Sequence, residues 1–178
     1  MVQMRVGFIS LSVAGIFLML TFVSCDSALL LKPTRFPSEF SCQISGDTLI
    51  GNFPRGHFQV RADGFKSWSE SQQIGGTREL FIRLSITSMD TLMLDFQDLY
   101  LQDSVQRKVA PDGIYLNSQR VQPITKLFIP PTFRTEIQLS FTSLDQSFRL
   151  PIMINFGEMY MSHPDDSIKF GGFWFDRR

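Results

Sequence analysis

The chain has 178 residues, with 17 Lys and Arg side chains against 17 Asp and Glu side chains, so its formal net charge is zero. Binding to nucleic acid draws on clustered positive charge, so this balance predicts no nucleic-acid partner. Two Cys and two His leave little material for a structural zinc site, and we expect neither a metal ion nor a cofactor. With 43% hydrophobic and 19% charged residues, the composition is that of a globular domain with a core.

The first 25 residues carry the clearest signal in the chain. Arg5 is the only charged residue before Asp26, and an apolar run extends between them from position 6 to position 23. A positive start followed by an apolar run is typical of a secretory signal peptide. The run ends in Phe22-Val23-Ser24-Cys25. This ending resembles the lipobox of bacterial lipoproteins, in which small residues precede an obligatory Cys.

The resemblance implies that Cys25 is a lipidation site. In that family the Cys thiol receives a diacylglyceryl group, and the signal peptide, here residues 1–24, is then cleaved. Two acyl chains suffice for stable anchoring, so a membrane becomes the expected partner, with the domain in the cell envelope outside the cytoplasm. A second interpretation stays open, because the apolar run approaches the ~20 residues that span a bilayer and would also serve as an uncleaved anchor.

The segment after the signal predicts a flexible tether over residues 25–38, since it contains Pro33 and Pro37 and no clear period. Residues 39–178 then form a single domain. Its first expected strand, residues 40–44, places Phe40, Cys42 and Ile44 on one face. Once Cys25 is acylated, Cys42 has no disulfide partner in the chain, and we expect it to be buried and unreactive.

Alternation of apolar and polar residues dominates the rest of the chain and predicts strands. It is clearest in residues 80–86, where four aliphatic side chains share one face. Residues 91–101 predict two short strand pieces around Gln97-Asp98. The remaining expected strands are 57–61, 114–116, 124–129, 137–141, 148–156 and 168–175. Many short strands separated by turn signals predict an all-β fold, an antiparallel β-sandwich or a small barrel.

Three details of strand pairing follow from this pattern. The strands over 137–141 and 148–156 are separated by a short polar segment, which predicts a hairpin between them. Pro151 lacks a backbone N–H, so its strand is expected at a sheet edge or with a bulge. In the last strand, Gly171-Gly172 predicts a bulge that returns Phe173 and Phe175 to the face of Phe170.

Catalytic motifs are absent from the sequence, and we expect no catalytic residues and no enzyme activity. His163 with Asp165 or Asp166 is the only histidine and carboxylate group close in sequence, and its composition is that of an ordinary polar turn. If a site exists, the long non-periodic stretches 64–77 and 103–113 are where it is expected.

Aromatic side chains offer a different kind of site. Trp68, Trp174 and Tyr160 are candidates for exposed rings that stack on a sugar or on a protein partner, although such rings often only cover the ends of a core. The leading interpretation is a non-catalytic binding or envelope-structural module. The alternatives are a carbohydrate-binding accessory lipoprotein that uses these aromatics, and a small hydrolase built around His163.

Overall fold

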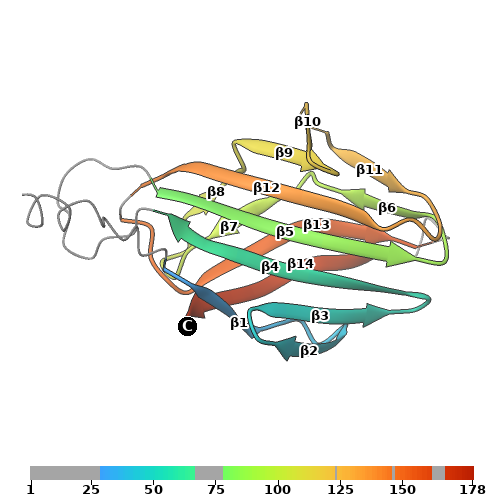
Figure 1. The fold of residues 1–178 in the computed structure, drawn as a ribbon, viewed down its shortest axis with the longest axis horizontal. Coiled ribbons are helices and arrows are strands. Elements are labelled where there is room, and N and C mark those ends of the chain that lie inside the picture. Colours follow the sequence, from blue (N-terminus) through green and yellow to red (C-terminus); the bar gives the residue numbers. More distant parts are fainter. Residues whose placement is uncertain (1–28, 67–77, 123, 146, 162–166) are drawn as a thin grey trace, which may run out of the picture.

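A computed structural model describes residues 29–66, 78–122, 124–145, 147–161 and 167–178 of the chain. In these residues the regular structure is entirely β, and the strands form two antiparallel sheets that pack face to face without closing into a barrel (Figure 1). The predicted β-sandwich is confirmed, and the barrel alternative is wrong. Within this described part, no helix is long and apolar enough to cross a membrane.

The first sheet has seven described strands, and its three longest strands lie side by side within it. In spatial order they are β10 (Gln119–Val121), β9 (Gly113–Leu116), β12 (Thr135–Leu144), β5 (Arg78–Ser88), β4 (Gly56–Lys66), β3 (Thr48–Phe53) and β2 (Ser41–Ser45). The alternation seen in residues 80–86 falls within β5, where Leu80, Ile82, Leu84 and Ile86 are all at most 1% exposed. The period of two therefore identified the buried face of this strand correctly.

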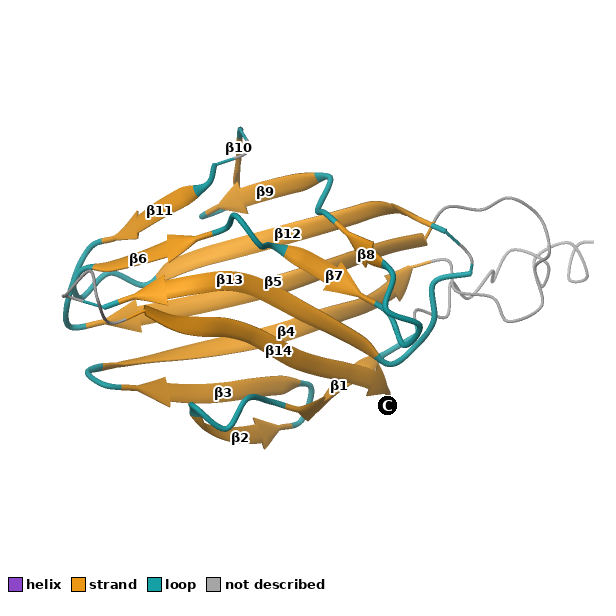
Figure 2. Cartoon of the chain, turned by 180° about the vertical axis from the view of Figure 1, so that it is seen from behind, coloured by secondary structure: helices purple, strands orange, loops and turns teal. Residues whose placement is uncertain are grey.

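The second sheet also has seven described strands, shown from behind in Figure 2. Its main order is β1 (Leu31–Arg35), β14 (Ser167–Arg177), β13 (Ile152–Tyr160), β6 (Leu92–Asp95) and β11 (Lys126–Ile129). β7 (Tyr100–Gln102) pairs with β13, and β8 (Lys108–Val109) pairs with β7. The two strand pieces expected around Gln97-Asp98 are confirmed as β6 and β7.

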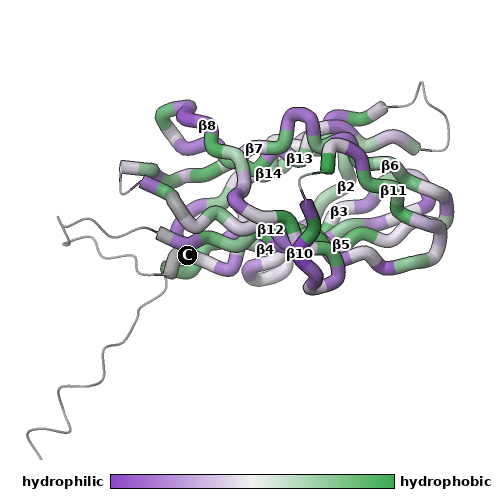
Figure 3. The backbone as a smooth tube through the Cα atoms, turned by 90° about the horizontal axis from the view of Figure 1, so that it is seen from above, coloured by the Kyte–Doolittle hydropathy of each residue, from purple (hydrophilic) through white to green (hydrophobic). Residues whose placement is uncertain are grey.

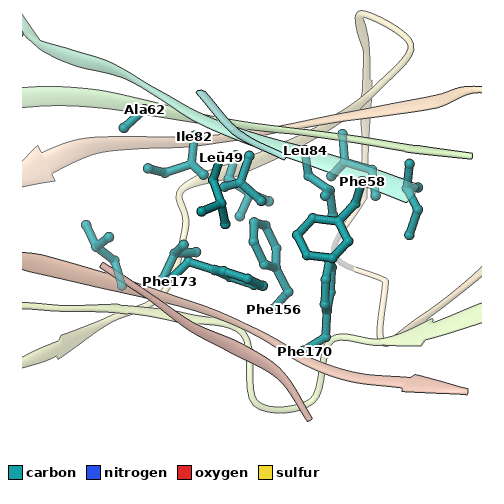
Figure 4. Packing of buried hydrophobic residues seen from close by; sticks show 14 of the residues in the cluster. Leu49, Phe58, Ala62, Ile82, Leu84, Phe156, Phe170 and Phe173 are labelled. Carbon is teal, nitrogen blue, oxygen red and sulfur yellow. The ribbon is translucent and has the colours of Figure 1, made fainter. Parts of the chain in front are cut away.

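The core between the sheets is rich in phenylalanine (Figure 4). Phe58 from the first sheet meets Phe170 from the second edge to face, with ring centroids 5.0 Å apart and planes at 86°. Phe40 completes the group from the segment before β2, 5.2 Å from Phe58. Edge-to-face contacts of this kind add to the free energy of burial, so the cluster joins the two sheets.

The predicted hairpin is wrong, because its two strands lie in different sheets. β12 pairs with β5 and β9, whereas β13 pairs with β14, β6 and β7. The intervening segment passes from one sheet to the other, and Phe148, expected in a strand, is buried within that connection. Alternation shows which side chains face the core, but two apolar faces can also meet across a sandwich without sharing hydrogen bonds.

Two further expectations are corrected at the proline residues. Pro151 precedes β13, which is a central strand and not an edge, and the register shifts of β13 lie between Ile154 and Glu158 and not at Pro151. Pro33 lies in β1, inside the segment predicted to be a tether, and Leu31 of the same strand is 1% exposed. β1 is an edge strand with a register shift between Pro33 and Arg35, and an edge tolerates a residue without an N–H. The tether interpretation is therefore wrong for residues 31–35.

The bulge predicted at Gly171-Gly172 is confirmed. Ile154 pairs with Phe173 and the next residue, Asn155, pairs with Gly171, so Gly172 is the extra residue, with φ of +78°. Phe170, Phe173 and Phe175 consequently all point into the core and are fully buried. A left-handed backbone at this position suits glycine, which has no Cβ to clash.

Candidate binding groove

A groove opens between the two sheets at the rim formed by β9, β10, β6 and β11, which is the upper rim in Figure 1. Its volume is about 670 Å³, and its walls are mainly apolar. Figure 3 looks onto this rim and shows the sheets as two layers with β10 between them. Ligand pockets in proteins usually have volumes of about 300–1,000 Å³, mostly apolar walls and a few polar groups. The apolar lining residues are Phe96, Leu99, Ala110, Pro111, Ile114, Val121 and Ile124.

One wall of the groove is the β9–β10 hairpin. Ile114 and Val121 are paired across it and so lie on the same face, with Ile114 buried and Val121 half-buried. The hairpin turns at Asn117 and Ser118, which both have positive φ, as a two-residue turn of matching twist requires. The Asn117 N–H donates to the Glu136 carbonyl oxygen at 2.8 Å, and the Glu136 N–H donates to Asn117 Oδ1 at 3.0 Å. These bonds hold the wall against β12.

The opposite wall is the turn that follows β6. The Phe96 N–H donates to the Thr125 carbonyl oxygen at 2.7 Å, and the Leu99 N–H donates to the Phe96 carbonyl oxygen at 3.0 Å. The Phe96 side chain is 6% exposed, while Leu99 and Ile124 are half-buried. The apolar surface that these side chains leave uncovered forms this side of the groove.

Charged groups lie at the groove's margin. The Arg120 guanidinium is exposed and donates to the Asp112 carbonyl oxygen at 3.4 Å, a long and weak contact. The Asp112 carboxylate accepts from the Thr142 hydroxyl at 3.0 Å and from the Thr142 N–H. Asp112 thus fastens the segment before β9 to β12, and the apolar interior of the groove contains no other charged side chain among the described residues.

The structure places the aromatic candidates away from the groove and away from each other. Trp174 on β14 and Tyr160 on β13 are both half-buried on the outer face of the second sheet. Trp174 pairs with Met153, seven residues before Tyr160, so the two positions are separated by about 23 Å along the strand. The Tyr160 hydroxyl donates to Glu158 Oε2 at 2.6 Å, and this hydrogen bond, with burial and the charges of Glu158 and Asp95, raises the Tyr160 pKa.

A smaller hollow of about 450 Å³ lies on the same outer face, over Gly171 and Gly172. Polar residues dominate its rim, including Asn155, whose Nδ2 donates to the Asp98 carbonyl oxygen at 2.9 Å. The Tyr100 ring at its margin is covered by Lys108, with Nζ 4.0 Å from the ring centroid. That contact occupies one face of the ring, which is then not available for stacking on a sugar.

Other predicted site residues lie outside the described residues, namely Cys25, Trp68, His163, Asp165 and Asp166. Of the two stretches where a site was expected, 103–113 contributes its last four residues to the groove, while most of 64–77 is outside the described part. Sequence reasoning missed Phe96, Leu99, Val121 and Ile124 as lining residues. These apolar residues lie at strand ends and in turns, where a closed core does not require apolar side chains. That position is the sequence signal that could have identified them as lining residues.

Cys42 is half-buried, less than expected, and packs against the core. Burial raises the pKa of its thiol to about 11. The thiolate is the reactive form, so this shift keeps the side chain protonated and unreactive at neutral pH.

Among the residues whose side-chain burial the structure describes, Asp103 is the one ionisable group that is fully buried. Its Oδ1 accepts from the N–H groups of Val105 at 3.0 Å and Arg107 at 2.9 Å. Its Oδ2 accepts from Arg107 Nε at 2.8 Å and Nη2 at 2.6 Å, and Arg107 also reaches Ser147 in the connection before β13. Burial raises the Asp103 pKa, but the hydrogen bonds from Arg107, Arg149 and Val105 outweigh it and hold the pKa below its usual value.

No group of three or more His, Cys, Asp and Glu side chains in the described ranges is placed to hold a metal ion. His57 is exposed beside the turn that joins β3 to β4. Comparisons of this chain with protein-family models, with curated proteins and with solved structures find no match.

Proposed function

We propose that this protein is a membrane-anchored lipoprotein whose β-sandwich is a non-catalytic binding module, with the groove between β9–β10 and β6–β11 as its ligand site. The supporting observation is the groove itself, which is open, mainly apolar and about 670 Å³ in volume. Its walls are held by hydrogen bonds on both sides, so it exists before a ligand arrives. A preformed site costs less to occupy than one that must be ordered on binding.

The chemistry of the groove favours an apolar ligand. The half-buried side chains Leu99, Val121 and Ile124 offer surface that binding would remove from water, at about 25 cal/mol per Å² of apolar area. The polar groups at the margin are few. They would orient a bound ligand but contribute less to its binding free energy than the apolar walls. An acyl chain or the apolar side chains of a partner segment fit this description.

The alternatives have less support. A sugar-binding surface would need aromatic rings gathered on one face, but Trp174 and Tyr160 are far apart and one face of the Tyr100 ring is occupied by Lys108. A hydrolase would be built around His163, which lies outside the described residues. Neither alternative therefore replaces the groove as the leading proposal.

Binding of the neutral fluorophore N-phenyl-1-naphthylamine tests the proposal. The purified full chain should increase its fluorescence in a saturable way. Val121→Asn, which places an amide in the apolar groove, should weaken binding about tenfold, because an amide without hydrogen-bond partners costs about 1–3 kcal/mol to bury. Val105→Asn is the matched control, since Val105 is 54% exposed and outside the groove. No saturable binding, or equal loss in both variants, would refute the groove as the site.

A further inference from the structure

The edges of the two sheets differ in how they are protected from pairing with another strand. An unpaired edge presents free N–H and C=O groups, and proteins usually block it with charges, proline, a bulge or a very short strand. Edge strand β1 carries Lys32, Pro33 and Arg35 and has a register shift. β11 carries Lys126 and is followed by Pro130-Pro131.

The shorter edges are protected in the same way. β10 has three residues and includes Arg120, and β8 has two residues, Lys108 and Val109. Each of these four described strands therefore has at least one feature that opposes the addition of a further strand.

β2 (Ser41–Ser45) has none of these features. Its five residues contain no charge and no proline, and its register with β3 is continuous from the first residue to the last. Ser41, Gln43 and Ser45 are exposed, and so is Ile44, at 45%. Figures 1 and 2 both show β2 at the lower rim of the molecule with no strand beyond it. This edge is open to one more antiparallel strand.

The sequence of β2 is complementary to itself. If a second copy pairs antiparallel about Gln43, then Ser41 lies opposite Ser45 of the second copy, and Cys42 lies opposite Ile44 of the second copy. Because paired residues share a face, the polar side chains meet on the outer face and the apolar ones on the inner face. The exposed Ile44 would be covered by the second copy.

Within the paired strand, charge does not oppose this arrangement. β2 is uncharged, so the pairing of its five residues places no like charges opposite each other. Just outside the strand, Glu39 lies opposite Asp47 of the second copy, and the ion pair of Asp47 Oδ2 with Arg61 Nε at 3.2 Å offsets part of that repulsion. We propose that β2 is a self-association surface, through which two copies of this chain form a continuous antiparallel sheet centred on Gln43.

A pairing of five residues is small compared with the ~800 Å² per partner of a standard interface. We therefore expect a weak dimer, with a dissociation constant of about 1–100 µM. Anchoring in a membrane would raise the local concentration of the chain and favour the dimer. The proposed dimer depends neither on the anchor nor on the groove. A negative result for the dimer would therefore leave the proposed function unaffected.

Cross-linking of the full chain in membranes tests the pairing directly. In a background that carries Cys25→Ala and Cys42→Ser, Gln43→Cys places one thiol per copy at the proposed two-fold, where paired Cβ atoms are about 4.5–5.5 Å apart. A short bis-maleimide should convert this variant into a covalent dimer. The matched control is Gln119→Cys in the same background, an exposed position on β10 at the other edge of the same sheet.

The second measurement is sedimentation velocity of the full chain in detergent. Gln43→Lys should raise the dissociation constant roughly five- to tenfold by placing two ammonium groups opposite each other, while Gln119→Lys should leave it unchanged. Absence of the dimer in the unsubstituted chain, equal cross-linking at positions 43 and 119, or cross-linking of position 43 to a different protein would each overturn the inference.

Discussion

Asp103 shows how a single carboxylate joins segments that are distant in sequence. It accepts hydrogen bonds from its own loop and, through Arg107, it is linked to the connection that carries the chain from β12 to β13. Buried charge is costly unless it is paired and hydrogen-bonded, and this group is both. We infer that Asp103 fixes the loop after β7 against the crossover between the sheets.

Asp103→Asn should lower the free energy of unfolding at pH 7 by about 3 kcal/mol, because the new amide NH₂ would face the Arg107 guanidinium and the ion pair would be lost. Denaturation in urea measures the change. Asp47→Asn is the control and should cost under about 1 kcal/mol, since the Asp47–Arg61 pair is partly exposed. A loss of the same size in both variants would contradict the role assigned to Asp103.

The pH dependence of stability checks the same residue. The folded-state pKa of Asp103 is depressed, so its contribution is fully present above the unfolded value of about 3.9. It is lost as the pH falls through the folded pKa. The difference in stability between the unsubstituted chain and Asp103→Asn should therefore persist from pH 7 to about pH 5 and shrink below about pH 4.

At the scale of elements, β13 and β14 form the most irregular pair in the described fold. Their register shifts twice, and Gly157 on β13 has φ of +94° and lies against the end of β6 at Asp95. A Cβ at Gly157 would be 2.0 Å from the Asp95 carbonyl oxygen, which is backbone and cannot move aside cheaply. The irregularity brings β13 close to β6, whose following turn forms one wall of the groove.

Gly157→Ala should destabilise the fold by about 3 kcal/mol or more, since both the left-handed φ and the backbone contact oppose a Cβ. Gly46→Ala isolates the first of these effects. Gly46 has φ of +63° but open space around its missing Cβ, so we expect a cost of about 1–2 kcal/mol. Thermal unfolding of the two variants measures the difference, and equal costs would show that the contact with Asp95 is relieved by movement of the chain.

On the scale of the whole molecule, the two proposed surfaces lie at opposite rims of the sandwich. The groove opens between β9–β10 and β6–β11, whereas β2 lies at the far edge of the first sheet (Figure 1). A second copy on β2 would therefore leave the groove open. β1 places the start of the described chain beside β14, so the proposed anchor at Cys25 is separated from the folded domain by only a few residues.

The anchor has its own test. Mass spectrometry of the protein from bacterial membranes should detect a mature N-terminus at Cys25 that carries acyl chains, and Cys25→Ala should leave residues 1–24 attached. Cys25→Ala also serves as the control, because it shows the mass expected for a chain that keeps residues 1–24 as an uncleaved membrane span. Recovery of a peptide containing Met1 or Arg5 from the unsubstituted membrane protein would support that span and contradict processing.

Local pattern was enough to predict much of the fold. Alternation in residues 80–86 and 137–141 identified the buried faces of β5 and β12, and Gly171-Gly172 identified the bulge in β14, because side-chain orientation in a strand repeats every two residues. The segment that resembles a lipobox predicts a location in the cell envelope, and this prediction also rests on a short stretch of sequence. Composition and the absence of catalytic motifs also led to the expectation of a binding module.

Tertiary structure alone decided which strands are partners. The sequence of β12 and β13 fits a hairpin as well as it fits opposite sheets, since both arrangements bury the same apolar faces. β1 was missed because two residues on its inner face, one of them Pro33, make too short a pattern to recognise. The groove could not be predicted either, because Phe96, Val121 and Ile124 come from separate segments and meet only where two sheet rims diverge. The open edge of β2 likewise depends on its neighbours, since the same five residues in the middle of a sheet would be paired on both sides.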